Sequence, residues 1–182
     1  MGTMLRSATS FLVLSLVAIQ AVVASTIRPG TYLIQDTRTK LFLSIGPVPR
    51  LYPSIDVAVR LFPESSPFLE PWTVKEGADG GIIVISARSG VPDKYRITSK
   101  ENAVIVSVQK KPETWNTEQV GEGPLVVAIK MPYDDKVFTA NEDEFPQVTL
   151  QPSIGEDNQR FRFIPIEREL YHRNRFTVQD TC

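Results

Sequence analysis

Two residue types that carry much of protein chemistry are nearly missing from this sequence. The 182 residues include 1 cysteine, Cys182 at the last position, and 1 histidine, His172. A single cysteine cannot form an internal disulfide, so a secreted chain of this composition must be held together by its core. A Ser-His-Asp triad or a Cys-His pair would have to use His172, in a polar segment near the C-terminus. Because zinc, P-loop and G-x-S-x-G motifs are missing too, we expect no enzyme, no metal site and no cofactor.

Neither sign of charge is in excess. The chain has 20 basic and 21 acidic residues, a formal net charge of −1. A nucleic-acid-binding protein usually carries a basic face or stripe, and none stands out here, so we expect no nucleic-acid partner. The acidic clusters at 134–135 and 142–144 could suggest a glycosidase pair or a calcium loop, but we interpret them as solvated turn residues.

Long hydrophobic runs are missing beyond the N-terminus. The run at 11–23 follows Arg6 and ends in small residues around Ala24 and Ser25. It is shorter than the ~20 residues that a membrane-spanning helix needs, although a membrane anchor is the alternative. The pattern is typical of a cleaved signal peptide, which we place at residues 1–24. We therefore expect a secreted protein with no membrane attachment after cleavage.

The rest of the chain lacks helical periodicity. No window of about 11 residues sustains a helical period. Short β-branched and aromatic runs alternate with turn residues instead, which predicts an all-β domain. The predicted strands are 30–36, 41–45, 57–62, 71–75, 80–85, 95–97, 103–108, 114–115, 121–129, 136–140, 147–151 and 159–163.

These strands fall into three similar units, each ending in an aromatic residue. Trp72, Trp115 and Phe161 recur at intervals of about 40–50 residues, a period that indicates a repeat architecture. Propeller blades have a similar period, but a propeller needs about 4 or more of them. Twelve short strands in three pseudo-repeats without helices predict a β-trefoil, in which we interpret the three aromatic residues as core.

Proline is concentrated in one segment of the first unit, Gly-Pro-Val-Pro-Arg-Leu-Tyr-Pro at 46–53. Each proline fixes φ near about −65° and removes a backbone donor, and the residue before it is pushed to extended geometry. We expect a stiff, exposed loop with Arg50 near its crest. Such a loop is already in the conformation that a trypsin-like protease binds, which lowers the entropy cost of docking. The alternative is an ordinary proline-rich surface connection.

Several segments resemble the fungal serine protease inhibitors of the cospin type. They are 29–34, 71–74, 137–148 and 161–163, and the stretch 139–148 is the most particular of them. The resemblance covers 27–167 and implies a β-trefoil inhibitor domain, similar to plant Kunitz-type inhibitors in fold only. It also implies a basic residue in the loop between the second and third strands, where this chain has Arg50. The signal peptide and the tail at 168–182 depart from the family's pattern, and Cys182 is either inert or a site for a bridge to another chain.

The resemblance implies a trypsin-directed mechanism. Arg50 would enter the acidic pocket with a charge-assisted, bidentate contact, and Leu51 would follow the scissile bond. Because the ends of the loop are anchored in the barrel, a cleaved bond could re-form, which gives inhibition rather than turnover. We expect a monomer whose partner is a trypsin-like serine protease. The predicted protease-binding residues are Val48, Pro49, Arg50, Leu51 and Tyr52.

Two alternatives stay open. A second basic loop contains Arg88, in an exposed connection that is glycine-bearing and therefore more costly to order. A carbohydrate-binding β-trefoil lectin is the other alternative, because such lectins often carry Q-x-W or Q-x-F near the end of each repeat. The chain matches once, at Gln159, while the equivalent positions hold Glu70 and Glu113.

Overall fold

The described part of the chain is all-β, as predicted. The computed structural model describes residues 27–47, 56–87, 95–123, 125–143 and 146–167. These contain two short 3-10 helices, η1 (Ala78–Gly80) and η2 (Asp157–Gln159). The 13 strands are β1 (Gly30–Asp36), β2 (Phe42–Ser44), β3 (Val57–Ala58), β4 (Arg60–Phe62), β5 (Trp72–Glu76), β6 (Ile82–Ser86), β7 (Arg96–Lys100), β8 (Ala103–Ser107), β9 (Asn116–Gln119), β10 (Val126–Lys130), β11 (Lys136–Asn141), β12 (Gln147–Pro152) and β13 (Phe161–Pro165).

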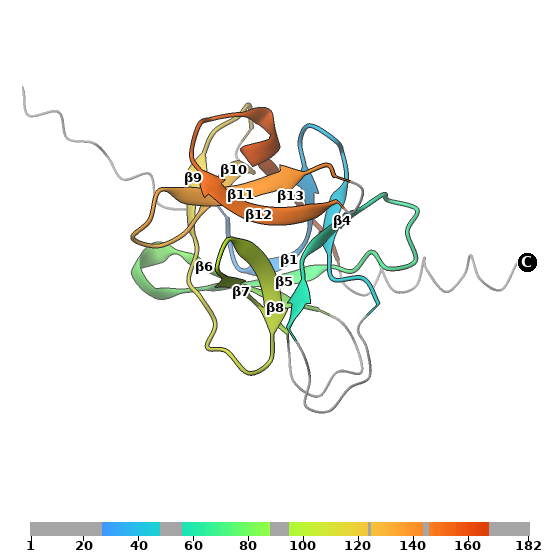
Figure 1. Ribbon diagram of the computed structural model, residues 1–182, viewed down its shortest axis with the longest axis horizontal. Helices are drawn as coiled ribbons and strands as arrows, with labels where there is room; N and C mark the ends of the chain where they lie inside the picture. The colour runs from blue at the N-terminus through green and yellow to red at the C-terminus, as the bar shows by residue number, and fades with distance from the viewer. Residues whose placement is uncertain (1–26, 48–55, 88–94, 124, 144–145, 168–182) are drawn as a thin grey trace, which may run out of the picture.

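The strands wrap into a closed barrel (Figure 1). Strand β1 pairs antiparallel with β5 on one side and with β13 on the other. From β5 the pairing runs through β6, β7, β8, β12, β11 and β10 and returns to β13. Closure satisfies the backbone hydrogen bonds within this ring and leaves it without an edge strand. Strands β2 and β4 form an antiparallel pair in which β2 also pairs with β1 and β4 also pairs with β12.

The predicted number of strands is too low, because the predicted strand 57–62 is two strands. Strand β9 begins one residue beyond the predicted strand 114–115. Val59 lies between β3 and β4, and its N–H donates to the Val104 carbonyl at 2.9 Å. Its own carbonyl accepts from the Val148 N–H at 3.0 Å. Strand β3 before it pairs with β8, whereas β4 after it pairs with β2 and β12. The chain changes partners at Val59, a change that the pattern of side chains along 57–62 does not reveal.

The three aromatic residues that end the units lie in the core, as predicted. Trp72, Trp115 and Phe161 are each at most 1% exposed. The Phe138 ring contacts Trp115 and Phe161 edge-on, at centroid distances of 4.7 and 6.2 Å. The Trp72 indole N–H donates to the Leu43 carbonyl at 2.8 Å, so this ring also ties β2 to β5. Edge-on aromatic packing of this kind stabilises the fold beyond the contribution from burying the rings.

Some predictions concern residues outside the described ranges. These are the signal peptide at 1–24 and the tail at 168–182, which contains His172 and Cys182. Among the residues that are described, no helix has the length and apolar character to span a bilayer. The same residues contain no group of three or more side chains arranged to hold a metal ion.

Candidate functional site

The predicted protease-binding loop is framed by described residues but is not itself described. Val48, Pro49, Arg50, Leu51 and Tyr52 lie outside the described ranges, as does Arg88. The chain leaves the described barrel at Pro47, after β2, and re-enters it at Asp56, before β3. The contacts around these two positions show how each end of the segment is held to the barrel.

On the N-terminal side, buried contacts hold the chain up to Gly46. Ser44 is fully buried, and its hydroxyl donates to the Phe68 carbonyl at 2.6 Å. Gly46 has φ +64°, in the left-handed region that residues other than glycine rarely adopt. A Cβ at this position would lie 2.9 Å from Cζ of Phe62. Any other residue here would carry backbone strain and would have to displace that ring.

An aromatic pair lies next to this turn and was missed in the sequence. The Phe62 and Phe68 rings are 6.0 Å apart and tilted by 57°. Phe68 is 41% exposed, although its backbone is bonded to Ser44 in the base of the loop. The signal that could have found it is a phenylalanine within a run of proline, serine and glutamate at 63–67. Such a residue has no apolar periodicity around it to bury it.

On the C-terminal side, backbone pairing holds the chain. Val57 is opposite Val106 and Ala58 is opposite Ile105 in the antiparallel β3–β8 pair. The Asp56 carboxylate is 4.0 Å from the Lys100 ammonium. Both side chains are partly exposed, so this ion pair contributes little to stability. The strand pairing, rather than the ion pair, holds the point where the chain re-enters the barrel.

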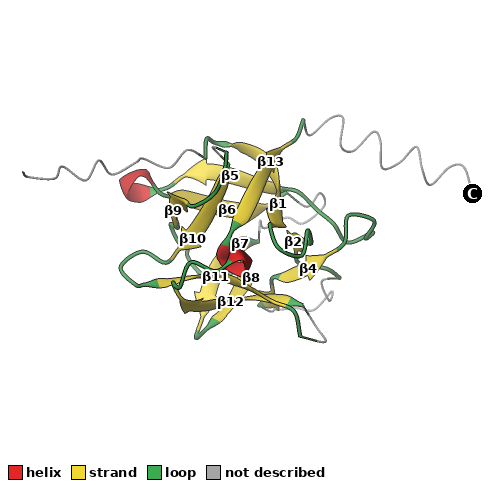
Figure 2. Cartoon of the chain, turned by 90° about the horizontal axis from the view of Figure 1, so that it is seen from above, coloured by secondary structure: helices red, strands yellow, loops and turns green. Residues whose placement is uncertain are grey.

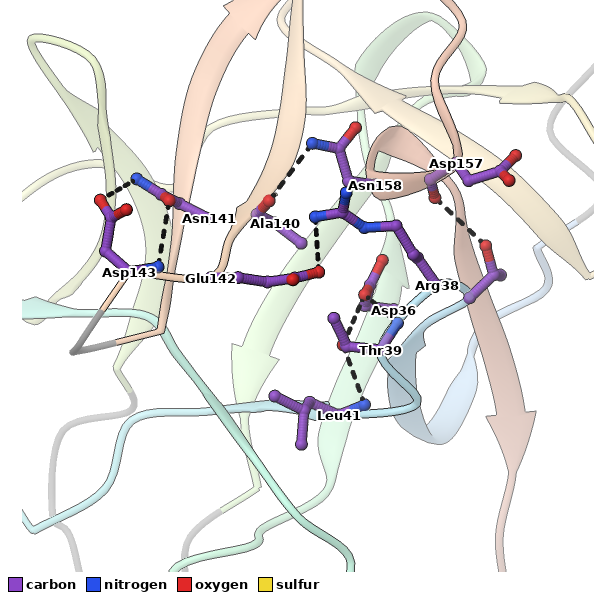
Figure 3. A network of polar contacts seen from close by, with 11 residues as sticks. Asp36, Arg38, Thr39, Leu41, Ala140, Asn141, Glu142, Asp143, Asp157 and Asn158 are labelled. Carbon is purple, nitrogen blue, oxygen red and sulfur yellow. Dashed lines mark hydrogen bonds and ion pairs between the residues drawn. The ribbon is translucent and has the colours of Figure 1, made fainter.

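A polar network supports the start of β2 (Figure 3). The buried Asp36 carboxylate accepts from the Thr39 N–H at 2.8 Å and from the Thr39 hydroxyl at 2.6 Å. The same Thr39 oxygen accepts from the Leu41 N–H at 3.2 Å. Because a buried carboxylate needs such donors, the turn after β1 is held in one conformation. Strand β2 therefore leaves this turn in a defined direction.

The network extends to the connection between β11 and β12. Figure 3 shows Arg38 and Glu142 pointing toward one another, and their side chains form an ion pair at 2.5 Å. The Pro146 carbonyl of the same connection accepts from the Leu61 N–H of β4 at 3.0 Å. This connection belongs to the stretch 139–148 that carries the most particular resemblance to cospin-type inhibitors. Its described contacts reach the turn before β2 and strand β4, which pairs with β2 beside the base of the predicted loop.

The second basic candidate also lies between hydrogen-bonded flanks. The Ser86 N–H donates to the Tyr95 carbonyl at 2.8 Å, and the Ala87 N–H donates to the Pro71 carbonyl at 3.0 Å. Tyr95 is buried. The segment 88–94 therefore joins two neighbouring strands, β6 and β7, through closely spaced flanks.

The residue that suggested a lectin has a structural role here. Gln159 is 3% exposed. Its side-chain oxygen accepts from the N–H groups of Ile154 and Gly155 at 3.0 and 3.1 Å. Its amide nitrogen donates to the Pro152 carbonyl at 2.8 Å and to the Thr139 hydroxyl at 3.2 Å. With four internal hydrogen bonds the amide is fully used, so the Gln159 side chain has no group left to contact a ligand itself.

The glutamate at the equivalent position of the second unit is used in a similar way. One Glu113 oxygen accepts from the hydroxyls of Thr98 and Ser99, each at 2.9 Å. In both units, a polar side chain before the buried aromatic residue binds hydroxyls on the neighbouring hairpin. The two side chains therefore share a structural role in their units.

No protein-family model and no curated protein matches the sequence. Solved structures do match. A proteinase inhibitor from Coprinopsis cinerea aligns with a TM-score of 0.64 at 18% identity, over 77% of this chain and 99% of its own. A ricin B-like lectin from Macrolepiota procera, in complex with lactose, aligns with a TM-score of 0.56 at 13% identity, over 77% and 98% of the two chains. ThreeFoil, a designed protein with three-fold symmetry, aligns with a TM-score of 0.57 at 14% identity, over 75% and 99%.

These likenesses confirm the resemblance predicted from the sequence at the level of the fold. The matching structures are β-trefoil proteins, and the closed all-β barrel described above agrees with that architecture. An inhibitor and a lectin share this fold, and a fold alone does not decide between two functions. The function has to be argued from the surroundings of the predicted loop.

Proposed function

We propose that this chain is a secreted inhibitor of trypsin-like serine proteases, with Arg50 entering the acidic specificity pocket. The observation that carries the proposal is the frame around the proline-rich segment. Gly46 is held against Phe62 on one side, and Val57 is paired with β8 on the other. A substrate-like inhibitor needs an extended segment whose two ends stay in place after cleavage. Buried contacts on the Gly46 side and the strand pairing of half-buried Val57 on the other support that requirement.

The roles of the loop residues follow from substrate geometry. Arg50 would pair with the carboxylate at the floor of the pocket, and Leu51 would follow the scissile bond. Val48, Pro49 and Tyr52 would line the neighbouring subsites of the protease. Phe68, exposed beside the base of the loop, offers an apolar contact to the rim of the same enzyme.

Secretion is part of the proposal and rests on the apolar run at 11–23. Mass spectrometry of the protein from its native medium should find Ser25 or Thr26 as the first residue. Recovery of the intact N-terminus from the cytosol would contradict this part.

Inhibition constants against trypsin test the assignment of Arg50. Removing one partner of a desolvated charge pair costs about 2–5 kcal/mol, which weakens binding by roughly 30- to several-thousand-fold. Arg50→Ala should therefore nearly abolish inhibition without changing the thermal melt. Arg50→Lys should keep much of it, and Arg50→Leu should shift the preference toward chymotrypsin-like enzymes.

The matched control is Arg60→Ala, because Arg60 is exposed on β4 beside the base of the same loop. It should inhibit like the unmodified chain. An Arg50→Ala protein that still inhibits trypsin within about threefold, far less than the expected loss, would overturn the assignment. If Arg88→Ala abolished inhibition instead, the second loop would be the reactive one. A chain that inhibits no serine protease but binds sugars would favour the lectin alternative.

A further inference from the structure

An open groove lies on a different side of the barrel from strand β4, which pairs with β2 beside the described base of the predicted loop. It has a volume of about 510 Å³ and is lined by Asn116, Lys130, Met131, Tyr133, Asp134 and Asp135. Asn116 on β9 and Lys130 on β10 are cross-strand partners, and the other four residues come from the connection between β10 and β11. Figures 1 and 2 show this connection and strand β4 on opposite sides of the molecule.

Tyr133 stands out in this groove. It is 97% exposed, and its φ of +64° is rare for a bulky side chain. The connection around it is held on both sides, because the Met131 N–H donates to the Lys136 carbonyl at 2.9 Å and the Ser153 N–H donates to the Asp135 carbonyl at 3.0 Å. An uncommon backbone conformation that the surrounding chain maintains is a reason to look for a function. Here it holds an aromatic ring out in solvent at the rim of a groove.

Two of the three charged residues that line the groove, Lys130 and Asp134, have counter-charges beside them. The Lys130 ammonium is 2.8 Å from a Glu118 carboxylate oxygen, and the Asp134 carboxylate is 3.9 Å from the Lys136 ammonium. A charged ligand would have to compete with these pairs. The groove instead offers donors from Lys130, acceptors from Asp134 and both from Asn116. That mixture suits hydroxyl groups, each of which donates and accepts.

We propose that this groove binds a neutral saccharide. The Tyr133 ring would pack against the apolar C–H face of one sugar, and Met131 would extend that apolar surface. Asn116, Lys130 and Asp134 would hydrogen-bond the hydroxyls at the edge. The volume is within the range of about 300–1,000 Å³ typical of small-molecule sites. The proposal does not depend on protease inhibition, since no residue of the groove belongs to the predicted loop or its frame.

Saturation-transfer NMR with lactose, maltose, mannose and N,N′-diacetylchitobiose as probes tests the proposal, followed by titration of any that binds. Tyr133→Asn removes the ring at a φ that asparagine tolerates, so the variant should fold at least as well. It should weaken binding by about tenfold or more, in line with the loss of an aromatic contact. Tyr133→Phe should bind within about twofold of the unmodified chain, a small change on that scale. Ile154→Ala, at another exposed apolar side chain, is the control and should change nothing.

Three outcomes would overturn the saccharide site. None of the four probes binds, Tyr133→Asn binds them unchanged, or free arginine or acetate occupies the groove in their place. Trypsin inhibition separates this proposal from the one above. Tyr133→Asn should inhibit as well as the unmodified chain, and Arg50→Ala should keep its saccharide affinity.

Discussion

At the scale of single residues, Gly46 determines where the predicted loop departs from the barrel. It combines a left-handed φ with a close approach to the Phe62 ring. Gly155 has a similar φ of +75°, but a Cβ there would meet no atom within 4 Å. An alanine at Gly155 would meet only backbone strain, whereas an alanine at Gly46 would meet the same strain and a clash with Phe62. Comparing the two substitutions therefore separates the two free-energy costs.

We predict that Gly46→Ala destabilises the fold by about 2–4 kcal/mol, because the left-handed φ and the displaced ring both cost free energy. Gly155→Ala should cost only the strain, about 1 kcal/mol. Urea denaturation of both variants measures the difference. If Gly46 also positions the reactive loop, its variant should lose trypsin inhibition and the Gly155 variant should not. Equal losses of stability would show that Phe62 yields freely.

Tyr32 is a buried residue with a titratable group. Its hydroxyl donates to the Arg28 carbonyl at 2.8 Å, and its ring packs edge-on against Phe163 at 5.6 Å. Burial raises the pKa of Tyr32 above its ordinary value of 10.0, and the nearby Arg28 charge opposes the shift only in part. The folded state therefore holds this proton more tightly than the unfolded state does.

The raised pKa predicts a loss of stability in alkali. The contribution is fully present below the unfolded pKa of about 10 and is lost as the pH rises through the folded pKa. The free energy of unfolding of the unmodified chain, minus that of Tyr32→Phe, should therefore fall as the pH rises above about 10. Chemical denaturation across that range measures it, and other titrating groups cancel in the difference. Parallel curves for the unmodified chain and Tyr32→Phe would contradict the prediction.

At the scale of elements, Gln159 and Glu113 occupy equivalent positions in two units but make different kinds of hydrogen bond. Gln159 both accepts and donates, whereas the described contacts of Glu113 are accepted bonds from two hydroxyls. An amide oxygen can accept such hydroxyl bonds as well as a carboxylate oxygen can. A carboxylate cannot donate to a carbonyl unless it is protonated. The free-energy cost of Gln159→Glu should therefore differ from the cost of Glu113→Gln.

We predict that Gln159→Glu costs about 2–3 kcal/mol at neutral pH, because a carboxylate oxygen would then face the Pro152 carbonyl. Glu113→Gln should cost less than about 1 kcal/mol, since its amide oxygen keeps both hydroxyl bonds. Thermal melts of the two variants at pH 7 and at acid pH measure this asymmetry. Acid should reduce the Gln159→Glu penalty by protonating the new carboxyl. A mild effect of Gln159→Glu at pH 7 would mean that its hydrogen bonds are dispensable.

Much of the element structure was predictable from local pattern. The strand at 30–36 was predicted with its observed bounds, and most other strands lie within a few residues of their predicted ranges. Alternation and β-branched residues report burial on a sheet, so they locate strands well. They do not indicate which strands pair with one another, so the change of pairing partner at Val59 was missed. The exposure of Phe68 and Tyr133 depends on contacts between distant segments, which the local sequence does not contain.

At the scale of the whole molecule, closure of the barrel links the two ends of the domain. Strand β13 pairs with β1 over five residue pairs, from Tyr32 opposite Pro165 to Asp36 opposite Phe161. It also pairs with β10. The Ile166 N–H adds a bond to the Thr31 carbonyl at 3.0 Å. The last strand therefore completes a ring that the first strand begins, and the folded unit should end close behind Ile166.

We predict that a chain of residues 27–167 folds cooperatively and melts within a few degrees of the chain that keeps the tail, because terminal residues outside the paired strands add little stability. A chain of residues 27–160 should not fold. It lacks β13 and with it Phe161 and Phe163, both at most 1% exposed. Losing a buried phenylalanine side chain costs about 3–5 kcal/mol, so two such losses approach the whole stability of an ordinary domain, about 5–15 kcal/mol. Circular dichroism melts of both chains measure this. A cooperative melt for 27–160 would show that the ring does not need its last strand, and failure of 27–167 would place the boundary of the domain within the tail.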